Sequence, residues 1–220
     1  MTGRPQNLVI AVDGPAASGK GTIARALARH YVLPHLDTGK LYRAVGLAVR
    51  LAGEDPADAG VAEAHARNLD PQLLDVADLM SGENALSASI VSAHPGVRAA
   101  LLKRQHDFAG QSGGAVLDGR DIGTVICPDA VAKLFVTARP EVRAQRRHRE
   151  LCDSGDQRLF ADVLADIAAR DARDSGRDTA PLIMADDALL LDTSDLVIDA
   201  AVRRAIALVE SRISAVRKRD

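Results

Sequence analysis

A glycine-rich run close to the start of the chain has the residue types and spacing of a phosphate-binding loop. It consists of Gly14, Pro15, Ala16, Ala17, Ser18, Gly19, Lys20, Gly21 and Thr22. Residues 7–13, which precede it, have the apolar and β-branched content of a buried parallel strand. The glycines let backbone amides point inward, the next helix presents its N-terminus to an anion, and Lys20 adds a mobile cation. This arrangement favours the binding of nucleotide phosphates.

The position after the lysine departs from the commonest form of this motif. Gly21 stands where Ser or Thr is usual, and Thr22 comes one place later. Thr22 is therefore one candidate contact for a Mg²⁺ ion brought by the nucleotide, directly or through water. The simpler interpretation of the run is a glycine turn between a strand and a helix. The order of strand, loop, lysine and helix favours the phosphate site.

A second group of polar residues follows a short predicted strand at residues 33–37. Asp37 and Thr38 stand at the end of this strand, and Tyr42 and Arg43 lie one turn into the next helical pattern. The arrangement suits a second ligand that carries a phosphate. Taken alone, Asp37 and Thr38 are ordinary helix-capping residues and Arg43 is a solvated charge. The phosphate-binding loop nearby favours the ligand.

Charges of both signs meet where another predicted strand, residues 115–118, comes to its end. Asp118 closes the strand, and Arg120 and Asp121 follow in the loop. The planar guanidinium of Arg120 suits a phosphate, Asp121 can accept a hydrogen bond from the amino group of a base, and Asp118 can hold Mg²⁺ through water. The structural alternative is an ion pair within the loop that only shapes it.

The segment from residue 170 to 177 is dense in arginine and aspartate. On a helix, Arg170, Arg173 or Asp174, and Arg177 share one face, so that two or three guanidinium groups can close over one ligand. A salt-bridged, solvated helix face explains the same spacing. Arg146, in the preceding helical pattern, raises the same question. Together these clusters favour an electrostatic clamp of the kind that phosphoryl transfer requires.

The elements that must position these groups alternate between strands and helices. Beyond the first strand, further strands are predicted at residues 33–37, 115–118, 132–137 and 196–198. Apolar residues at helical spacing predict helices at residues 19–31, 39–51, 95–109, 140–152 and 200–213. This α/β alternation predicts a five-stranded parallel sheet with helices on both faces and ligands at the carboxyl ends of the strands.

Two stretches do not follow that alternation. Residues 53–94 are rich in Ala, Asp and Gly with weak periodicity, and residues 153–181 mix Arg and Asp around a helical segment at 159–170. Both are candidate mobile excursions over the ligand crevice. The six histidines show no metal-ligand spacing and no acid grouped around them, so we interpret them as surface or packing residues.

Composition excludes several classes of protein. The chain has 220 residues and a net charge of −2 from 28 basic and 30 acidic residues, so no overall field attracts nucleic acid or an anionic membrane. Three Phe, two Tyr and no Trp disfavour a single-strand binder that stacks bases. Two cysteines, no leader and no run of 18 apolar residues predict a soluble cytoplasmic protein with reduced thiols.

Taken together, the motifs resemble those of the bacterial cytidylate kinases, a group of the nucleoside monophosphate kinases. The matching segments, in the family's order, are residues 14–22, 36–43, 118–129 and 170–182. The resemblance implies a P-loop NTPase-type fold in one domain, residues 1–220. Its core is residues 7–52, 95–152 and 182–217, its monophosphate-binding insert is about 53–94, and its short lid is about 153–181.

The implied reaction is transfer of the γ-phosphoryl group of ATP to CMP or dCMP. The resemblance implies that Mg²⁺ arrives with ATP, held by no direct protein ligand, with water-bridged contacts to Thr22 or Asp118. It also implies a monomer without nucleic acid or membrane partners. Another small-molecule kinase, acting on AMP, shikimate or dephospho-coenzyme A, is the alternative. A GTP-dependent switch protein needs an Asn/Thr-Lys-x-Asp motif, which the chain lacks.

Site residues are carried over from the family position by position. The implied ligands of the acceptor's phosphate are Arg43, Arg120 and Arg177. The implied readers of the cytosine edge are Ser89, Arg98 and Asp121. The implied contacts of the sugar hydroxyls are Arg170 and Asp174. The acceptor site also takes in Asp37, Thr38 and Tyr42, and the ATP site takes in residues 14–22 and Arg146. The implied catalytic groups are Lys20, Arg120, Arg170 and Arg177.

Overall fold

A five-stranded parallel sheet forms the centre of the computed structural model, which describes residues 7–153 and 155–217. The strands are β1 (Asn7–Asp13), β2 (His35–Asp37), β3 (Gly113–Gly119), β4 (Ala132–Thr137) and β5 (Leu189–Asp192). Their order across the sheet is β2-β3-β1-β4-β5, and all neighbouring pairs are parallel. The predicted sheet type is therefore confirmed, with β1 in the middle.

The prediction of a last strand at residues 196–198 was wrong. Strand β5 lies earlier, at Leu189–Asp192, where it pairs with β4, and Ile198 begins the last helix. Val197 and Ile198 are 72% and 67% exposed, so their apolar character does not mark a buried strand. The leucine run of β5 offered the better signal, because Leu191 is buried in the sheet.

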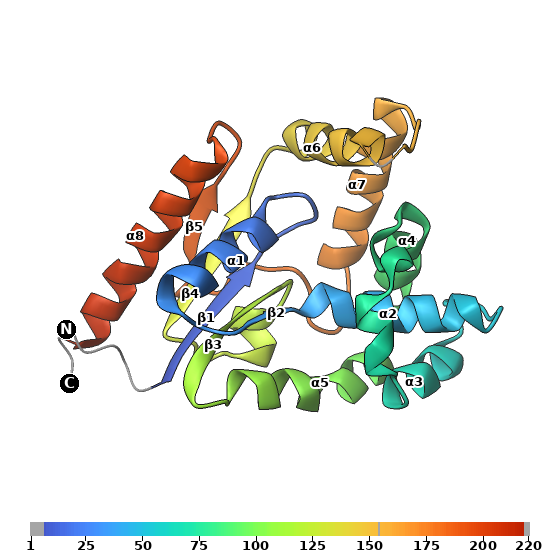
Figure 1. Cartoon of the computed structure of the whole chain (residues 1–220), viewed down its shortest axis with the longest axis horizontal. Helices are drawn as coiled ribbons and strands as arrows, with labels where there is room; N and C mark the ends of the chain where they lie inside the picture. The colour runs from blue at the N-terminus through green and yellow to red at the C-terminus, as the bar shows by residue number, and fades with distance from the viewer. Residues whose placement is uncertain (1–6, 154, 218–220) are drawn as a thin grey trace.

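Helices cover both faces of the sheet, as Figure 1 shows. The long helices around the sheet are α1 (Lys20–Tyr31), α2 (Thr38–Leu51), α5 (Pro95–Ala109), α6 (Pro140–Asp153) and α8 (Ile198–Arg217). On one face, alternate β1 residues Leu8, Ile10 and Val12 pack with α1 and α8. The opposite face, which includes Ala11, packs against the short π-helix η3 (Ile122–Ile126) and the end of α5.

Residues 53–94, which carried only weak periodicity, fold into a small helical unit against α2. The elements of this unit are α3 (Ala59–Arg67), η1 (Pro71–Asp75), η2 (Ala77–Met80) and α4 (Gly82–Val91). Its core is separate from those of the sheet and includes Leu41 and Leu47 of α2 together with Leu79 and Val91. Many of its apolar positions are alanines, which explains the weak sequence pattern.

The helical segment predicted at 159–170 is present as α7 (Phe160–Ser175), which continues five residues further than the pattern indicated. Helix α7 packs against α6, and the pair projects beside α4 in the upper right of Figure 1. Within residues 7–153 and 155–217, no helix combines the length and the apolar character that crossing a membrane requires.

Candidate active site

The phosphate-binding loop, residues 14–22, connects the central strand β1 to α1 at the carboxyl edge of the sheet. Gly14 has φ 153°, and a β-carbon there would overlap the carbonyl oxygen of Val136 in β4. Gly19, directly before α1, has φ 87°, a left-handed conformation that favours glycine. Lys20 is the first residue of the helix. Both glycines are thus required by the backbone that turns the loop toward the helix N-terminus.

Contacts from the far end of the sheet hold this loop in place. The Thr193 hydroxyl, just after β5, donates to the carbonyl of Ser18 at 2.9 Å. Arg146 of α6 donates to the Thr193 hydroxyl at 2.9 Å and to the Thr193 carbonyl at 2.7 Å. Arg143 donates to the carbonyl of Ala16 at 3.3 Å. Arg146 therefore adjoins the loop, as its predicted place in the ATP site requires.

Lys20 lies in a chain of charged groups at the edge of the sheet. Its ammonium is 3.9 Å from Oδ2 of Asp118, and Oδ1 of the same carboxylate is 2.7 Å from Nε2 of His35. Burial, and to a smaller extent the charge of Arg120, lowers the pKa of Lys20 to about 8. An anion bound in the loop would favour the charged ammonium again.

The expectation that no acid is grouped around a histidine was wrong for His35, which lies beside Asp118. In the register of β2 and β3, His35 is opposite Val116 and Asp37 is opposite Asp118. His35 is therefore a diagonal neighbour of Asp118 on paired strands, close enough for side chains to meet. Strand pairing is the signal that a linear search for histidine and acid lacks.

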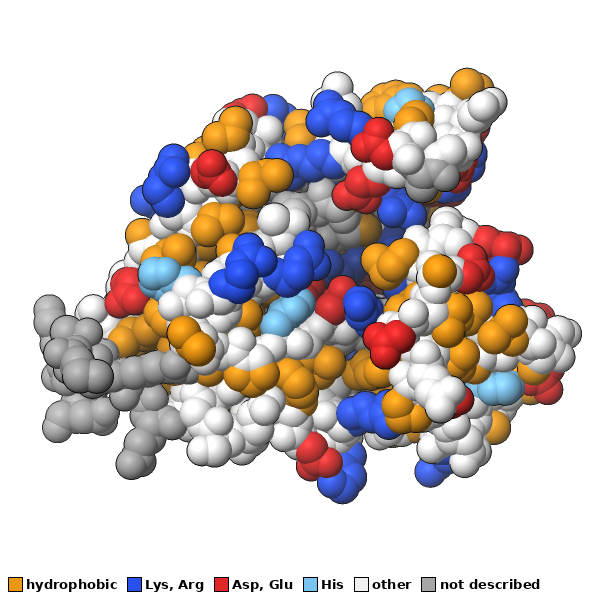
Figure 2. Space-filling view, in the orientation of Figure 1, with side chains coloured by type: hydrophobic (Ala, Val, Ile, Leu, Met, Phe, Trp, Pro, Cys, Tyr) orange, Lys and Arg blue, Asp and Glu red, His pale blue; other side chains and the backbone are white. Residues whose placement is uncertain are grey.

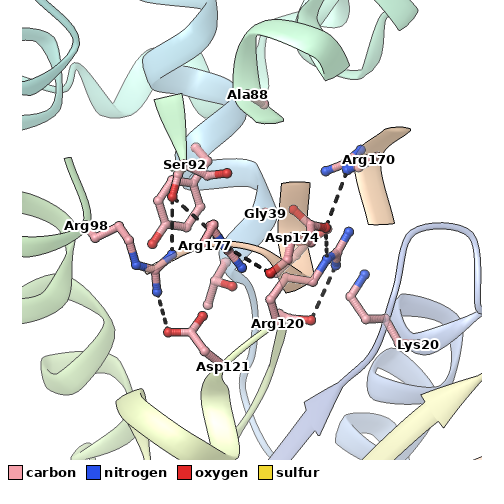
Figure 3. Close-up of a pocket in the computed structure, with 14 residues that line it drawn as sticks. Lys20, Gly39, Ala88, Ser92, Arg98, Arg120, Asp121, Arg170, Asp174 and Arg177 are labelled. Carbon is pink, nitrogen blue, oxygen red and sulfur yellow. Dashed lines mark hydrogen bonds and ion pairs between the residues drawn. The ribbon is translucent and has the colours of Figure 1, made fainter. Parts of the chain in front are cut away.

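A pocket beside Lys20 gathers most of the predicted acceptor residues (Figure 3). Its lining comprises Lys20, Asp37, Thr38, Gly39, Tyr42, Ala88, Ser92, Arg98, Gly119, Arg120, Asp121, Arg170, Asp174 and Arg177. We call it the acceptor pocket. Lys20 and Arg98 lie on opposite sides of it in Figure 3. In Figure 2, Lys and Arg side chains gather inside the hollow between α4 and the α6–α7 pair.

At the end of the acceptor pocket away from Lys20, Arg98 of α5 and Asp121 form a buried ion pair. The Arg98 guanidinium carbon also lies 5.7 Å from the centre of the Tyr42 ring. Burial raises the pKa of Asp121, and the charges of Arg98 and Arg177 oppose that shift. The pair places a hydrogen-bond donor and an acceptor side by side against an aromatic ring.

At the end near Lys20, two guanidinium groups lie beside one carboxylate. Nε of Arg120 is 2.7 Å from Oδ2 of Asp174, and Nε of Arg170 is 3.8 Å from the same oxygen. Burial and the charge of Arg120 lower the pKa of Arg170 to about 9. Nε of Arg170 and Nη2 of Arg177 are buried without a hydrogen-bond partner among the described residues. Buried donors of this kind are satisfied by an anion with several oxygens.

Two predicted acceptor residues lie outside the lining of this pocket. Arg43 donates to the carbonyl of Leu79 at 3.2 Å, toward the helical unit of residues 53–94. The Ser89 hydroxyl accepts from Nε of Arg173 at 3.1 Å. Ser92, which the sequence did not single out, lines the pocket instead, and its carbonyl accepts from Arg98 and Arg177 at 3.5 and 3.4 Å.

The described residues contain no cluster of three or more His, Cys, Asp or Glu side chains that could hold a metal ion. The two predicted contacts of a nucleotide-borne Mg²⁺ lie near Lys20. Asp118 is an almost fully buried carboxylate, and the Thr22 hydroxyl accepts from Nη2 of Arg25 at 3.4 Å. A carboxylate and a hydroxyl are oxygen groups of the kind that contact a hydrated Mg²⁺ held mainly by phosphates.

The sheet order, the glycine loop on its central strand and the arginine-lined pocket beside Lys20 define a P-loop kinase of the α/β class. Two solved structures share the fold. A gluconokinase from Sinorhizobium meliloti 1021 has a TM-score of 0.54 at 14% identity, covering 99% of both chains. An uncharacterized protein from Eubacterium ventriosum has a TM-score of 0.53 at 15% identity, covering 93% of this chain and 99% of its own.

Sequence comparison identifies the particular family. Residues 10–211 match the family model described as cytidylate kinase, and the chain belongs to that family. A cytidylate kinase from Xanthobacter autotrophicus is 62% identical over 93% of this chain and 98% of its own length. Those from Methylobacterium sp. strain 4-46 and Caulobacter vibrioides are 60% and 56% identical, over 93% and 92% of this chain and 98% and 95% of theirs.

Proposed function

We propose that this enzyme transfers the γ-phosphoryl group of ATP to CMP or dCMP, giving ADP and CDP or dCDP. Its membership of the cytidylate kinase family supports the proposal. The structural observation that carries it is the acceptor pocket. That pocket has the Arg98–Asp121 pair at one end and Lys20 of the phosphate-binding loop at the other. A base at the first end extends its phosphate toward the second.

When the acceptor binds, its groups replace contacts that charged side chains of the protein make with one another. Asp121 accepts from the cytosine amino group, and Arg98 donates to the ring nitrogen and carbonyl. Ser89 is a further base contact in this proposal, once its hydroxyl is released from Arg173. The buried donors of Arg177 and Arg170 support a place for the acceptor's phosphate and sugar at the other end of the pocket.

The remaining acceptor contacts come from residues that line the pocket and from Arg43, which lies outside its lining. Arg43, Arg120 and Arg177 bind the acceptor's phosphate. The sugar hydroxyls meet Arg170 and Asp174, whose pKa Arg120 and Arg170 hold below its usual value although burial opposes this. The pocket is completed by Asp37, Thr38 and Tyr42.

The donor nucleotide occupies the phosphate-binding loop, with Arg146 beside it. Mg²⁺, when bound to ATP, supplies positive charge that offsets the charge developing on the phosphates. Thr22 or Asp118 contacts it through water. Lys20, Arg120, Arg170 and Arg177 surround the transferred group, and a phosphate oxygen of the acceptor is the nucleophile. The protein's part is positioning and charge stabilisation, and no covalent intermediate is needed.

We further propose that residues 153–181 act as a lid and residues 53–94 as the monophosphate-binding insert of a cytoplasmic monomer. ATP must be protected from water until an acceptor is bound. Amide hydrogen exchange of residues 170–177 should therefore slow when a bisubstrate mimic is added. The matched control is α8, whose exchange should not change. Equal exchange of residues 170–177 with and without the mimic would contradict the lid.

An ADP-release assay across candidate acceptors tests the proposed function. CMP and dCMP should stimulate ATP turnover most, with UMP and AMP far behind and shikimate and dephospho-coenzyme A without effect. Cytosine presents an amino group to Asp121 together with a ring nitrogen and a carbonyl to Arg98, whereas uracil lacks the amino group and adenine lacks the carbonyl. Highest turnover with AMP or with an acceptor that is not a nucleotide would reject the proposal.

A further inference from the structure

We propose that Asp13 is a positioning residue for the acceptor pocket, which it connects to the strand that carries the phosphate-binding loop. The inference rests on the proposed function, because it assigns a further residue to the same reaction. Asp13 is the last residue of β1 and directly precedes Gly14. It does not line the acceptor pocket, so any effect that it has on the acceptor must act through other residues.

The alternation of β1 explains where the Asp13 side chain lies. Leu8, Ile10 and Val12 belong to the core under α1 and α8, so Asp13 falls on the face of Ala11, where η3 packs. Its two carboxylate oxygens each accept one backbone hydrogen bond from η3. Oδ1 accepts from the amide of Ile122 at 2.8 Å and Oδ2 from the amide of Gly123 at 2.7 Å.

These two amides belong to the first two residues after Asp121. Fixing both restricts the peptide planes that follow Asp121, and therefore the direction in which its carboxylate meets Arg98. Asp121 is the residue directly before η3, and its side chain makes no capping hydrogen bond to that helix. The bonds to Asp13 thus hold this end of η3 on the central strand of the sheet. A small displacement of a group that orients a substrate is enough to weaken its binding.

The buried position of Asp13 disfavours the charged form of its carboxylate. It is 5% exposed, and burial raises its pKa to about 7 although the amides of Gly123 and Ile122 oppose the shift. Buried polar atoms of folded proteins nearly always have a hydrogen-bond partner, and both carboxylate oxygens of Asp13 have one. Arg120, a proposed phosphate contact, directly precedes Asp121 in the same loop.

Asp13→Asn tests the assignment with almost no change in shape. The new amide group keeps one acceptor and turns a donor toward one of the two backbone amides, so η3 is held by one bond instead of two. We expect the KM for CMP to rise about tenfold or more, the KM for ATP to change less than threefold, and the preference for CMP over UMP to shrink. The double variant with Asp121→Asn should lose less than the two single effects combined, because both act on one contact.

Two further variants separate positioning from general damage. Val209→Ala leaves a cavity in the core on the opposite face of the sheet and should lower thermal stability without changing the ratio of the two KM values. Gly123→Ala places a β-carbon 3.1 Å from Cδ of Lys133 and 3.3 Å from Oδ2 of Asp13. It should displace η3 from Asp13 and raise the KM for CMP selectively. This variant decides the question if Asp13→Asn does not fold.

Equal changes in the KM for CMP and for ATP, or no change in either, would overturn the inference. So would fully additive effects in the double variant. Failure of the proposed function is distinguishable, because the wild-type enzyme would then not use CMP. In that case the ratio of the KM for the acceptor to the KM for ATP is measured with the acceptor that the enzyme does use. The comparison still applies, because η3 adjoins the acceptor pocket whatever base binds there.

Discussion

Lys20→Ala should lower kcat by about a hundredfold or more, which corresponds to roughly 3 kcal/mol of lost transition-state stabilisation. Lys20 belongs to the phosphate-binding loop and is the first residue of α1, and its ammonium lies 3.9 Å from the Asp118 carboxylate. In the proposed reaction its ammonium stabilises the negative charge that develops on the transferred phosphoryl group. Steady-state kinetics at saturating ATP and CMP measure this loss directly.

The fold should survive this change, because the Lys20 side chain contributes no apolar packing to the cores of the protein. Circular dichroism and thermal unfolding check that point. Lys103→Ala is the matched control, since Lys103 is an exposed lysine of α5 that forms an ion pair with Asp107 one turn away. The control should keep wild-type turnover. Near-normal turnover of Lys20→Ala would reject the assigned role.

Asp121→Asn should reduce the preference for CMP over UMP, mainly through loss of activity with CMP. The wild type should favour CMP by roughly two orders of magnitude, as sites built around a hydrogen bond do. With UMP, O4 faces the Asp121 carboxylate and N3–H faces the Arg98 guanidinium. Each mismatched group costs about 1–3 kcal/mol when buried. An asparagine amide can donate to O4, which removes part of the penalty.

The measurement is kcat/KM for both nucleotides with both proteins. Asp107→Asn is the matched control, because it also removes an aspartate from an ion pair, on the exposed surface of α5. Its CMP to UMP ratio should equal that of the wild type. An unchanged ratio in Asp121→Asn would mean that Asp121 does not read the base and serves only as the structural partner of Arg98.

The sequence predicted β1, β3 and β4 well because their residues are mostly buried and include continuous apolar runs. The edge strand β5 was missed for the opposite reason. Its pattern is half exposed, with Leu190 55% exposed, while Val197 and Ile198 imitate a strand at the start of α8. Local hydrophobicity cannot separate these cases without the pairing of β5 with β4.

Most of the predicted acceptor residues meet in one pocket, but their pairing was not readable from the sequence. The structural alternative placed an ion pair within the loop of Arg120 and Asp121. Each residue instead pairs outside the loop, Arg120 with Asp174 of α7 and Asp121 with Arg98 of α5. Which charges meet depends on how distant helices pack over the sheet, and no local spacing encodes that.

The contact between Thr193 and Ser18 has a consequence for how the protein is made. It joins residues 175 positions apart, and β3 and β4, the two neighbours of the central strand β1, follow it by roughly a hundred residues or more. Contacts this distant in sequence form late, because closing long loops costs chain entropy before packing offsets it. During synthesis on the ribosome, residues 14–22 are therefore made well before β3, β4 and Thr193, and the loop cannot take its final shape until these later residues have emerged. Nucleotide binding should accordingly arise in one step with completion of the sheet.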